Sequence, residues 1–145
     1  MHDLYTIGYA GHSIVSFIDT LHQYGIEQVI DVRQLPHSRK PGFSKARLER
    51  ELTAANILYT HMIELGTPKT VRDALKRTGD YDDFFAKMRL YIAEQHSALQ
   101  TALDFVPGRR CALLCLEANH AECHRSVVAV ELQRRANFAL NIEHI

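Results

Sequence analysis

The sequence predicts an α/β protein, a three-layer sandwich around a mostly parallel sheet of Rossmann-like type. Two observations carry this prediction. Short apolar runs typical of buried strands alternate along the chain with longer segments whose apolar residues recur every three or four positions. The segments between successive apolar runs are long enough to form crossover helices, and a strand, helix and strand connected in this way form a right-handed unit with parallel strands.

The first such unit lies near the amino terminus. Leu4 to Gly8 is typical of a strand, and a glycine-flanked turn follows it. Ser13 is predicted to cap a helix that ends at Gly25, a residue suited to the left-handed conformation of a helix end. Gln28 to Val32 then forms the second predicted strand.

A basic loop, Gln34 to Lys45, comes next, because its prolines and glycine exclude a regular element. Ser44 is predicted to cap a helix that ends near Asn56. The third predicted strand is Ile57 to His61.

The middle of the chain is predicted to be helical. Thr67 and Pro68 suit the cap and first turn of a short helix that ends near Gly79. One long helix is expected from about Tyr81 to Phe105, since apolar residues cover one broad face of it.

The last predicted unit starts with the buried strand Ala112 to Leu116. A helix from Arg125 to Asn137 and a short strand from Asn141 to Ile145 complete it.

Composition limits the class of protein. With 145 residues, 46% of them hydrophobic, residues 1–145 are expected to form a single domain. Seventeen basic and seventeen acidic side chains cancel, so the overall charge does not favour nonspecific attraction to nucleic acid or membranes. Three cysteines without a leading signal peptide suggest a cytoplasmic protein. No apolar run approaches the ~20 residues of a membrane span, so no membrane partner is expected.

The most informative motif is Cys123-His124-Arg125, which follows Glu117 at a strand-to-helix turn. In parallel sheets, ligands bind where strand carboxyl ends meet helix amino ends. A helix amino end and a neighbouring cation are expected to lower the pKa of Cys123 and make it reactive, with Glu117 and His124 as further candidates for chemistry. The alternative is that Cys123 only packs. Cys111 and Cys115 are expected to be buried and inert.

Two other turns are expected at the same sheet edge. Asp31 and Arg33 alternate at a strand end and can point the same way; alternatively, Asp31 orders the following loop and Arg33 anchors it. The wall of the pocket is predicted to come from the turn after the first strand: Gly8, Tyr9, Gly11, His12 and Ser13.

The basic loop is a candidate phosphate-binding segment through Ser38, Arg39 and Lys40, with Phe43 available to stack on a base. The alternative is a solvated loop that Phe43 anchors.

A metal site could draw on residues of the carboxyl-terminal motif region, namely Cys115, Glu117, His120, Cys123 and His124. Structural zinc usually takes two close pairs of ligands, and this cluster lacks a second pair, so no metal ligand and no cofactor is assigned.

Four blocks of residues resemble domain-of-unknown-function family 488: Thr6-Ile7-Gly8-Tyr9 with Gly11, Asp31-Val32-Arg33, Ser38 to Ser44, and Leu113 to Glu117 with Cys123-His124-Arg125. The resemblance spans essentially the whole chain. It departs at Ala10, where relatives often carry an acidic residue. The resemblance implies the fold and a common site for the polar blocks, but no activity.

These features together predict a pocket at the strand carboxyl ends that binds a phosphorylated or otherwise anionic small ligand, either a nucleotide or a nucleic-acid end. Arg33, Arg39 and Arg125 would hold the anion, and Cys123, His124, Glu117 and Asp31 are the candidate catalytic residues. Two alternatives stay open: a noncatalytic ligand sensor or adaptor, and a metal-stabilised Cys/His cluster. The sequence does not decide whether the protein is an enzyme.

Overall fold

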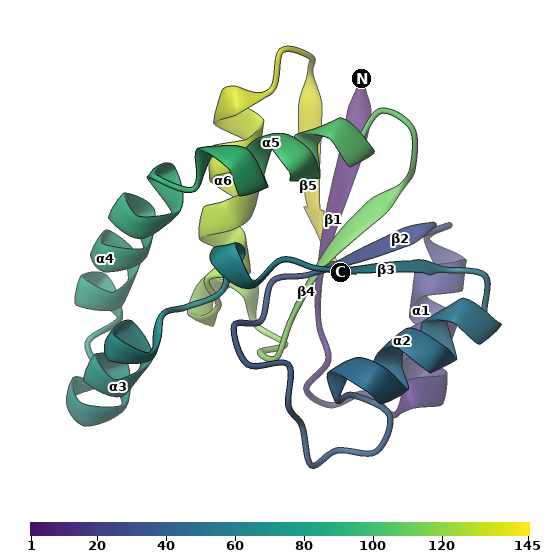
Figure 1. Cartoon of the computed structure of the whole chain (residues 1–145), viewed down its shortest axis with the longest axis horizontal. Helices are drawn as coiled ribbons and strands as arrows, with labels where there is room; N and C mark the ends of the chain where they lie inside the picture. Colours follow the sequence, from purple (N-terminus) through teal and green to yellow (C-terminus); the bar gives the residue numbers. More distant parts are fainter.

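A computed structural model describes residues 1–145 as a five-stranded, all-parallel sheet with helices on both faces (Figure 1). The strand order is β3-β2-β4-β1-β5. The predicted α/β fold is therefore confirmed, and the cysteine-containing strand lies at the centre of the sheet. The strands are β1 (His2–Gly8), β2 (Gln28–Asp31), β3 (Leu58–His61), β4 (Cys111–Cys115) and β5 (Leu140–His144).

The helices divide between the two faces according to the direction in which the chain moves across the sheet. From β1 to β3 the chain moves one way, and from β3 to β5 it returns, so right-handed crossovers place the two sets of helices on opposite faces (Figure 1). The first face carries α1 (Ile14–Gln23) and α2 (Lys45–Ala54); the second carries α3 (Lys69–Thr78), α4 (Tyr81–Ala93), α5 (His96–Phe105) and α6 (Arg125–Arg135). Two short 3-10 turns complete the chain, η1 (Ile63–Leu65) and η2 (His120–Glu122).

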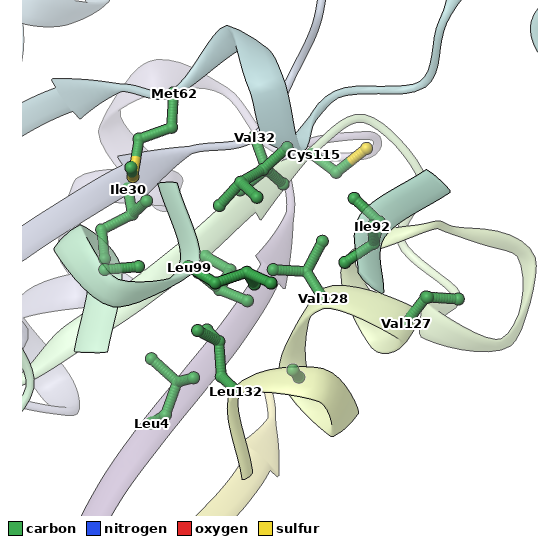
Figure 2. Packing of buried hydrophobic residues seen from close by; sticks show 14 of the residues in the cluster. Leu4, Ile30, Val32, Met62, Ile92, Leu99, Cys115, Val127, Val128 and Leu132 are labelled. Carbon is green, nitrogen blue, oxygen red and sulfur yellow. The ribbon is translucent and has the colours of Figure 1, made fainter. Parts of the chain in front are cut away.

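Strand β4 is buried on both faces because its side chains alternate between two apolar clusters. Ala112 and Leu114 pack with residues of α1 and α2, whereas Leu113 and Cys115 belong to the larger cluster beneath α4, α5 and α6. Figure 2 shows this larger cluster, in which aliphatic side chains of the strands meet those of the helices.

Helix α1 begins as predicted. The Ser13 hydroxyl accepts a hydrogen bond from the Ser16 amide, and the Ser16 hydroxyl accepts one from the Ser13 amide, both at 3.0 Å. Ser44 also stands at its predicted cap position, before α2, but its side chain makes no capping bond. No helix is long and apolar enough to cross a membrane.

One predicted element is wrong. The single helix expected from Tyr81 to Phe105 is two helices, which break at Glu94 and Gln95. The carbonyls exposed at the end of α4 find side-chain donors: Gln95 Nε2 donates to Tyr91 O at 3.2 Å, and Arg135 Nη2 of α6 donates to Ala93 O at 2.6 Å. These bonds stabilise a helix end at which the sequence has no glycine or proline.

The chain leaves β1 toward one face and leaves its neighbour β4 toward the other. Such a reversal between adjacent parallel strands opens a crevice at their carboxyl ends.

Candidate functional site

A cavity of about 200 Å³ lies at the carboxyl ends of β1, β2 and β4. Among the predicted site residues, the structure brings together five on its lining, contributed by the segments that follow all three strands: Tyr9, Arg33, Glu117, Cys123 and His124. The segments that follow β1, β2 and β4 thus meet at one cavity, to which the turn after β1 contributes only Tyr9 of its five predicted wall residues.

Asp31 and Arg33 form a buried pair, of which Arg33 lines the cavity. Arg33 Nε and Nη2 donate to the two carboxylate oxygens of Asp31 at 2.9 and 2.8 Å, and Tyr59 Oη donates to the same carboxylate at 2.5 Å. Arg33 Nη1 donates to Phe43 O at 2.7 Å. Asp31 has no exposed surface and does not line the cavity, so we assign it the positioning role that the sequence left open.

The pKa values around this pair follow from burial and from the carboxylate. Burial lowers the pKa of Arg33, but the hydrogen bond and charge of Asp31 outweigh it, so the pKa is raised. Burial and the adjacent Asp31 carboxylate raise the pKa of Tyr59 above its ordinary value. Arg33 therefore stays charged and fixed at the cavity wall at all physiological pH values.

Arg125 lies beneath the cavity. Its side chain is fully buried, and its guanidinium donates to Thr6 Oγ1 at 3.1 Å, to Glu117 O and to Ala118 O at 3.2 Å. It does not line the cavity. Arg125, predicted to hold an anion, is thus occupied in fixing the loop that follows β4, and we assign it a positioning role.

Cys115, Cys123 and His124 converge on the cavity wall. Their Sγ and Nδ1 atoms all lie within 4.8 Å of one another, and all three side chains are buried. His124 Nδ1 is 3.6 Å from Cys115 Sγ and 3.9 Å from Cys123 Sγ, and Glu117 Oε2 is 3.4 Å from Cys115 Sγ. Figure 2 shows Cys115 at the border of the apolar cluster, its sulfur pointing away from the aliphatic side chains.

The expected low pKa of Cys123 is contradicted. The Arg125 amide does donate to Cys123 Sγ at 3.5 Å, as a helix amino end should. However, burial in apolar surroundings raises the pKa of the Cys123 thiol well above its ordinary value. Because the Arg125 side chain is directed toward carbonyl groups, its charge does not compensate for that desolvation.

Phe43 is not available for a nucleobase. Its ring is fully buried and stacks on Tyr9, with ring centroids 4.6 Å apart. The alternative, in which Phe43 anchors the loop, therefore describes the structure. Several other predicted ligand residues lie outside the cavity lining: Gly8, Gly11, His12, Ser13, Ser38, Arg39 and Lys40.

Gly8 nevertheless shapes the site. A Cβ atom at this position would lie 1.8 Å from Glu117 O, so β1 and the loop after β4 approach each other too closely for any other residue.

Residues 13–132 match the family described as "Domain of unknown function DUF488". The chain belongs to this family. No curated protein and no solved structure matches the chain. The DUF488 span includes every residue that lines the cavity except Tyr9, so the cavity belongs to the part of the chain that the family shares. The family description carries no activity.

Sequence reasoning missed the part of the cavity that lies outside the strand ends. Arg72 and Leu75 from α3 and Phe84 from α4 line it, together with Gln34. Two buried atoms here have no hydrogen-bond partner, Arg72 Nε and Gln34 Oε1. The three-residue spacing of Arg72 and Leu75 puts both on one face of a helix, but nothing in that spacing indicates that this face meets the edge of the sheet.

Proposed function

We propose that this protein binds a small phosphorylated or otherwise anionic ligand in the cavity at the carboxyl edge of its sheet. The observation that carries the proposal is Arg72, which lines the cavity and whose Nε is buried without a hydrogen-bond partner. A buried donor without a partner costs about 1–3 kcal/mol. An oxyanion bound beside Arg72 would remove that cost and form a charge-assisted bond.

Arg33 supports an anion in a different way. Its Nε, Nη1 and Nη2 each donate one bond to Asp31 or Phe43, which fixes the guanidinium as a positive charge at the wall and leaves two of its five N–H groups for a ligand. Asp31 offsets part of that charge. Arg72 is therefore the principal candidate for direct contact.

The remaining polar wall favours a ligand that also carries hydrogen-bond donors. Gln34 Oε1 is a buried acceptor without a partner, and the carboxylates of Glu117 and Glu122 line the same cavity. Hydroxyl or amino groups next to a phosphate would satisfy these acceptors. A nucleotide or sugar phosphate has both kinds of group, whereas inorganic phosphate lacks the neighbouring hydroxyl or amino groups of an organic ligand.

The size of the cavity limits how much of such a ligand can enter it. Sites for complete drug-sized ligands usually measure about 300–1,000 Å³, whereas this cavity measures about 200 Å³. We infer that a phosphate and its immediate neighbour enter, while the rest of a nucleotide or of a nucleic-acid end stays outside. Three free thiols favour a reducing compartment, the cytoplasm, for this activity.

The test is ligand binding by Arg72→Gln, with Arg77→Gln as the matched control. Arg77 lies on the same helix, and its side chain is exposed and does not line the cavity. Isothermal titration and thermal unfolding would use inorganic phosphate, adenosine 5′-monophosphate and a short 5′-phosphorylated oligonucleotide.

We expect the two organic phosphates to raise the Tm of the wild type and of Arg77→Gln by about 3–6 °C at ten times Kd. Arg72→Gln should lose most of this shift. Equal shifts in both variants, or no shift with any probe in the wild type, would refute the proposal. Turnover of a bound ligand would separate an enzyme from a sensor or adaptor, since both bind.

A further inference from the structure

We propose that Cys115, Cys123 and His124 bind a zinc ion through their two Sγ atoms and Nδ1, with the fourth coordination position open to the cavity. This site goes beyond the proposed anion binding and does not rest on it. Cys115 ends β4, and the other two residues form the turn that leads into α6, so the rigid centre of the sheet and one helix start hold the three ligand atoms.

Two of the three spacings between the ligand atoms are those of a tetrahedral zinc site. Zinc bonds of about 2.3 Å to sulfur and 2.0–2.1 Å to nitrogen imply an edge of roughly 3.6 Å between a sulfur and a nitrogen. His124 Nδ1 lies 3.6 Å from Cys115 Sγ and 3.9 Å from Cys123 Sγ. The third spacing, between the two sulfurs, lies within 4.8 Å. Two sulfurs bonded to one zinc ion lie roughly 3.8 Å apart, so the two sulfurs need to approach each other by no more than about 1 Å.

His124 is oriented for this role by its other ring nitrogen. Nε2 lies 2.7 Å from Val32 O, an acceptor, so Nε2 carries a proton. In the neutral imidazole, the form that binds a metal, Nδ1 then presents its lone pair toward the two sulfurs. A backbone carbonyl that fixes the distal nitrogen is the usual support for a metal-bound histidine. The imidazole is buried, so its ring cannot turn to another partner.

The charges in the cluster also suit a dication. The Arg125 amide donates to Cys123 Sγ at 3.5 Å, a bond that a metal-bound sulfur would also accept. Two thiolates and one neutral imidazole around Zn²⁺ give a cluster with no net charge, and a neutral cluster is what a buried position tolerates. Thiolate sulfur selects zinc over magnesium or calcium.

The fourth position faces the ligand cavity because all three ligand residues line it. Glu117 also lines the cavity, with Oε2 3.4 Å from Cys115 Sγ, but it is not part of the trio. Three protein ligands with an open position are typical of a zinc ion that exchanges water for a substrate oxygen. Of the five residues that the sequence offered as ligands, His120 is excluded, because it is exposed and stacks on His144 at 3.7 Å.

The experiment is a titration of chelator-treated, reduced full-length protein with Co²⁺, a spectroscopic substitute for zinc, in phosphate-free buffer. The wild type should bind one equivalent and develop the thiolate charge-transfer and ligand-field bands of tetrahedral cobalt, which added Zn²⁺ should abolish. Cys115→Ala and Cys123→Ala should lose these bands. Cys111→Ala is the matched control: Cys111 is buried on the same strand, but its Sγ donates to Arg109 O and it should retain them.

The wild-type titration decides the question even if a variant fails to fold. Absence of cobalt bands in reduced wild type would overturn the proposal. So would equal loss in Cys111→Ala, measured beside circular dichroism that confirms folding. A third refuting result is a Cys115–Cys123 disulfide that leaves one free thiol and persists under the reducing conditions. Phosphate binding through Arg72 has its own readout, so the two proposals can fail separately.

Discussion

Replacing Arg125 by methionine separates a loop-positioning role from a ligand-binding role. Methionine fills the space of the aliphatic stem but donates no hydrogen bond. In the wild type, the guanidinium joins Thr6 of β1 to the carbonyls of Glu117 and Ala118. Arg125→Met should therefore loosen the loop that carries Glu117 and precedes Cys123.

The expected cost comes from the acceptors that lose a donor. Ala118 is exposed, so water can replace the bond to its carbonyl. Thr6 is fully buried and Glu117 is half-buried, and each lost bond at such a position costs about 1–2 kcal/mol. We expect a loss of about 2–4 kcal/mol in the free energy of unfolding, which corresponds to roughly 5–15 °C in Tm for a domain of this size.

Urea unfolding without any ligand measures this cost. Arg134→Met is the control, since Arg134 is an exposed residue of the same helix paired with Glu131 and should change stability by less than about 1 kcal/mol. If Arg125→Met unfolds at the wild-type urea concentration but loses the phosphate-induced shift in Tm, Arg125 binds the ligand and the positioning role is wrong.

Two further predictions concern stability. Gly8→Ala should cost about 3 kcal/mol or more because its Cβ would lie 1.8 Å from Glu117 O, whereas Gly108→Ala, with its nearest atom at 3.9 Å, should stay within about 0.5 kcal/mol in the same urea assay. Burial raises the pKa of the Cys111 thiol to about 12, so its contribution to stability is complete below pH ~9 and is lost as the pH rises toward 12. Urea unfolding between about pH 8 and 11 should show a fall that is up to about 1.4 kcal/mol per pH unit steeper in the wild type than in Cys111→Ala; parallel curves would contradict the buried thiol.

The sheet could be predicted because a local sequence pattern indicates each strand. Residues such as Val29 and Leu113 belong to short apolar runs with turns on either side, and parallel connection follows from the helical segments between them. The break between α4 and α5 could not be predicted. One of the donors that stabilises the end of α4 is Arg135, which is 42 residues away in the chain.

The candidate site likewise has a part that could be predicted from the sequence and a part that could not. Tyr9, Arg33 and the Cys123 turn could be placed together, because parallel strands bring their carboxyl ends to one edge. The role of Arg125 depended on which way its guanidinium points, and the surroundings of Cys123 depended on how deeply the turn is buried. Arg72 was not predicted as a site residue, because nothing near it in the sequence indicates that α3 covers the edge of the sheet.

The longest connection in the sheet, residues 62–110 between β3 and β4, supplies the outer wall of the cavity. Ala74 is the one buried residue of helix α3, and the partly buried Val71 and Leu75 pack against the larger apolar cluster, so α3 buries fewer residues than α4, α5 or α6. Segments of this kind open locally at a small fraction of the global unfolding free energy. Amide hydrogens of α3 should therefore exchange with solvent long before those of β4, and a ligand that contacts Arg72 should slow that exchange. Exchange in α3 that slows when ligand binds, with unchanged exchange in β4, would show that this helix opens locally while the sheet stays folded.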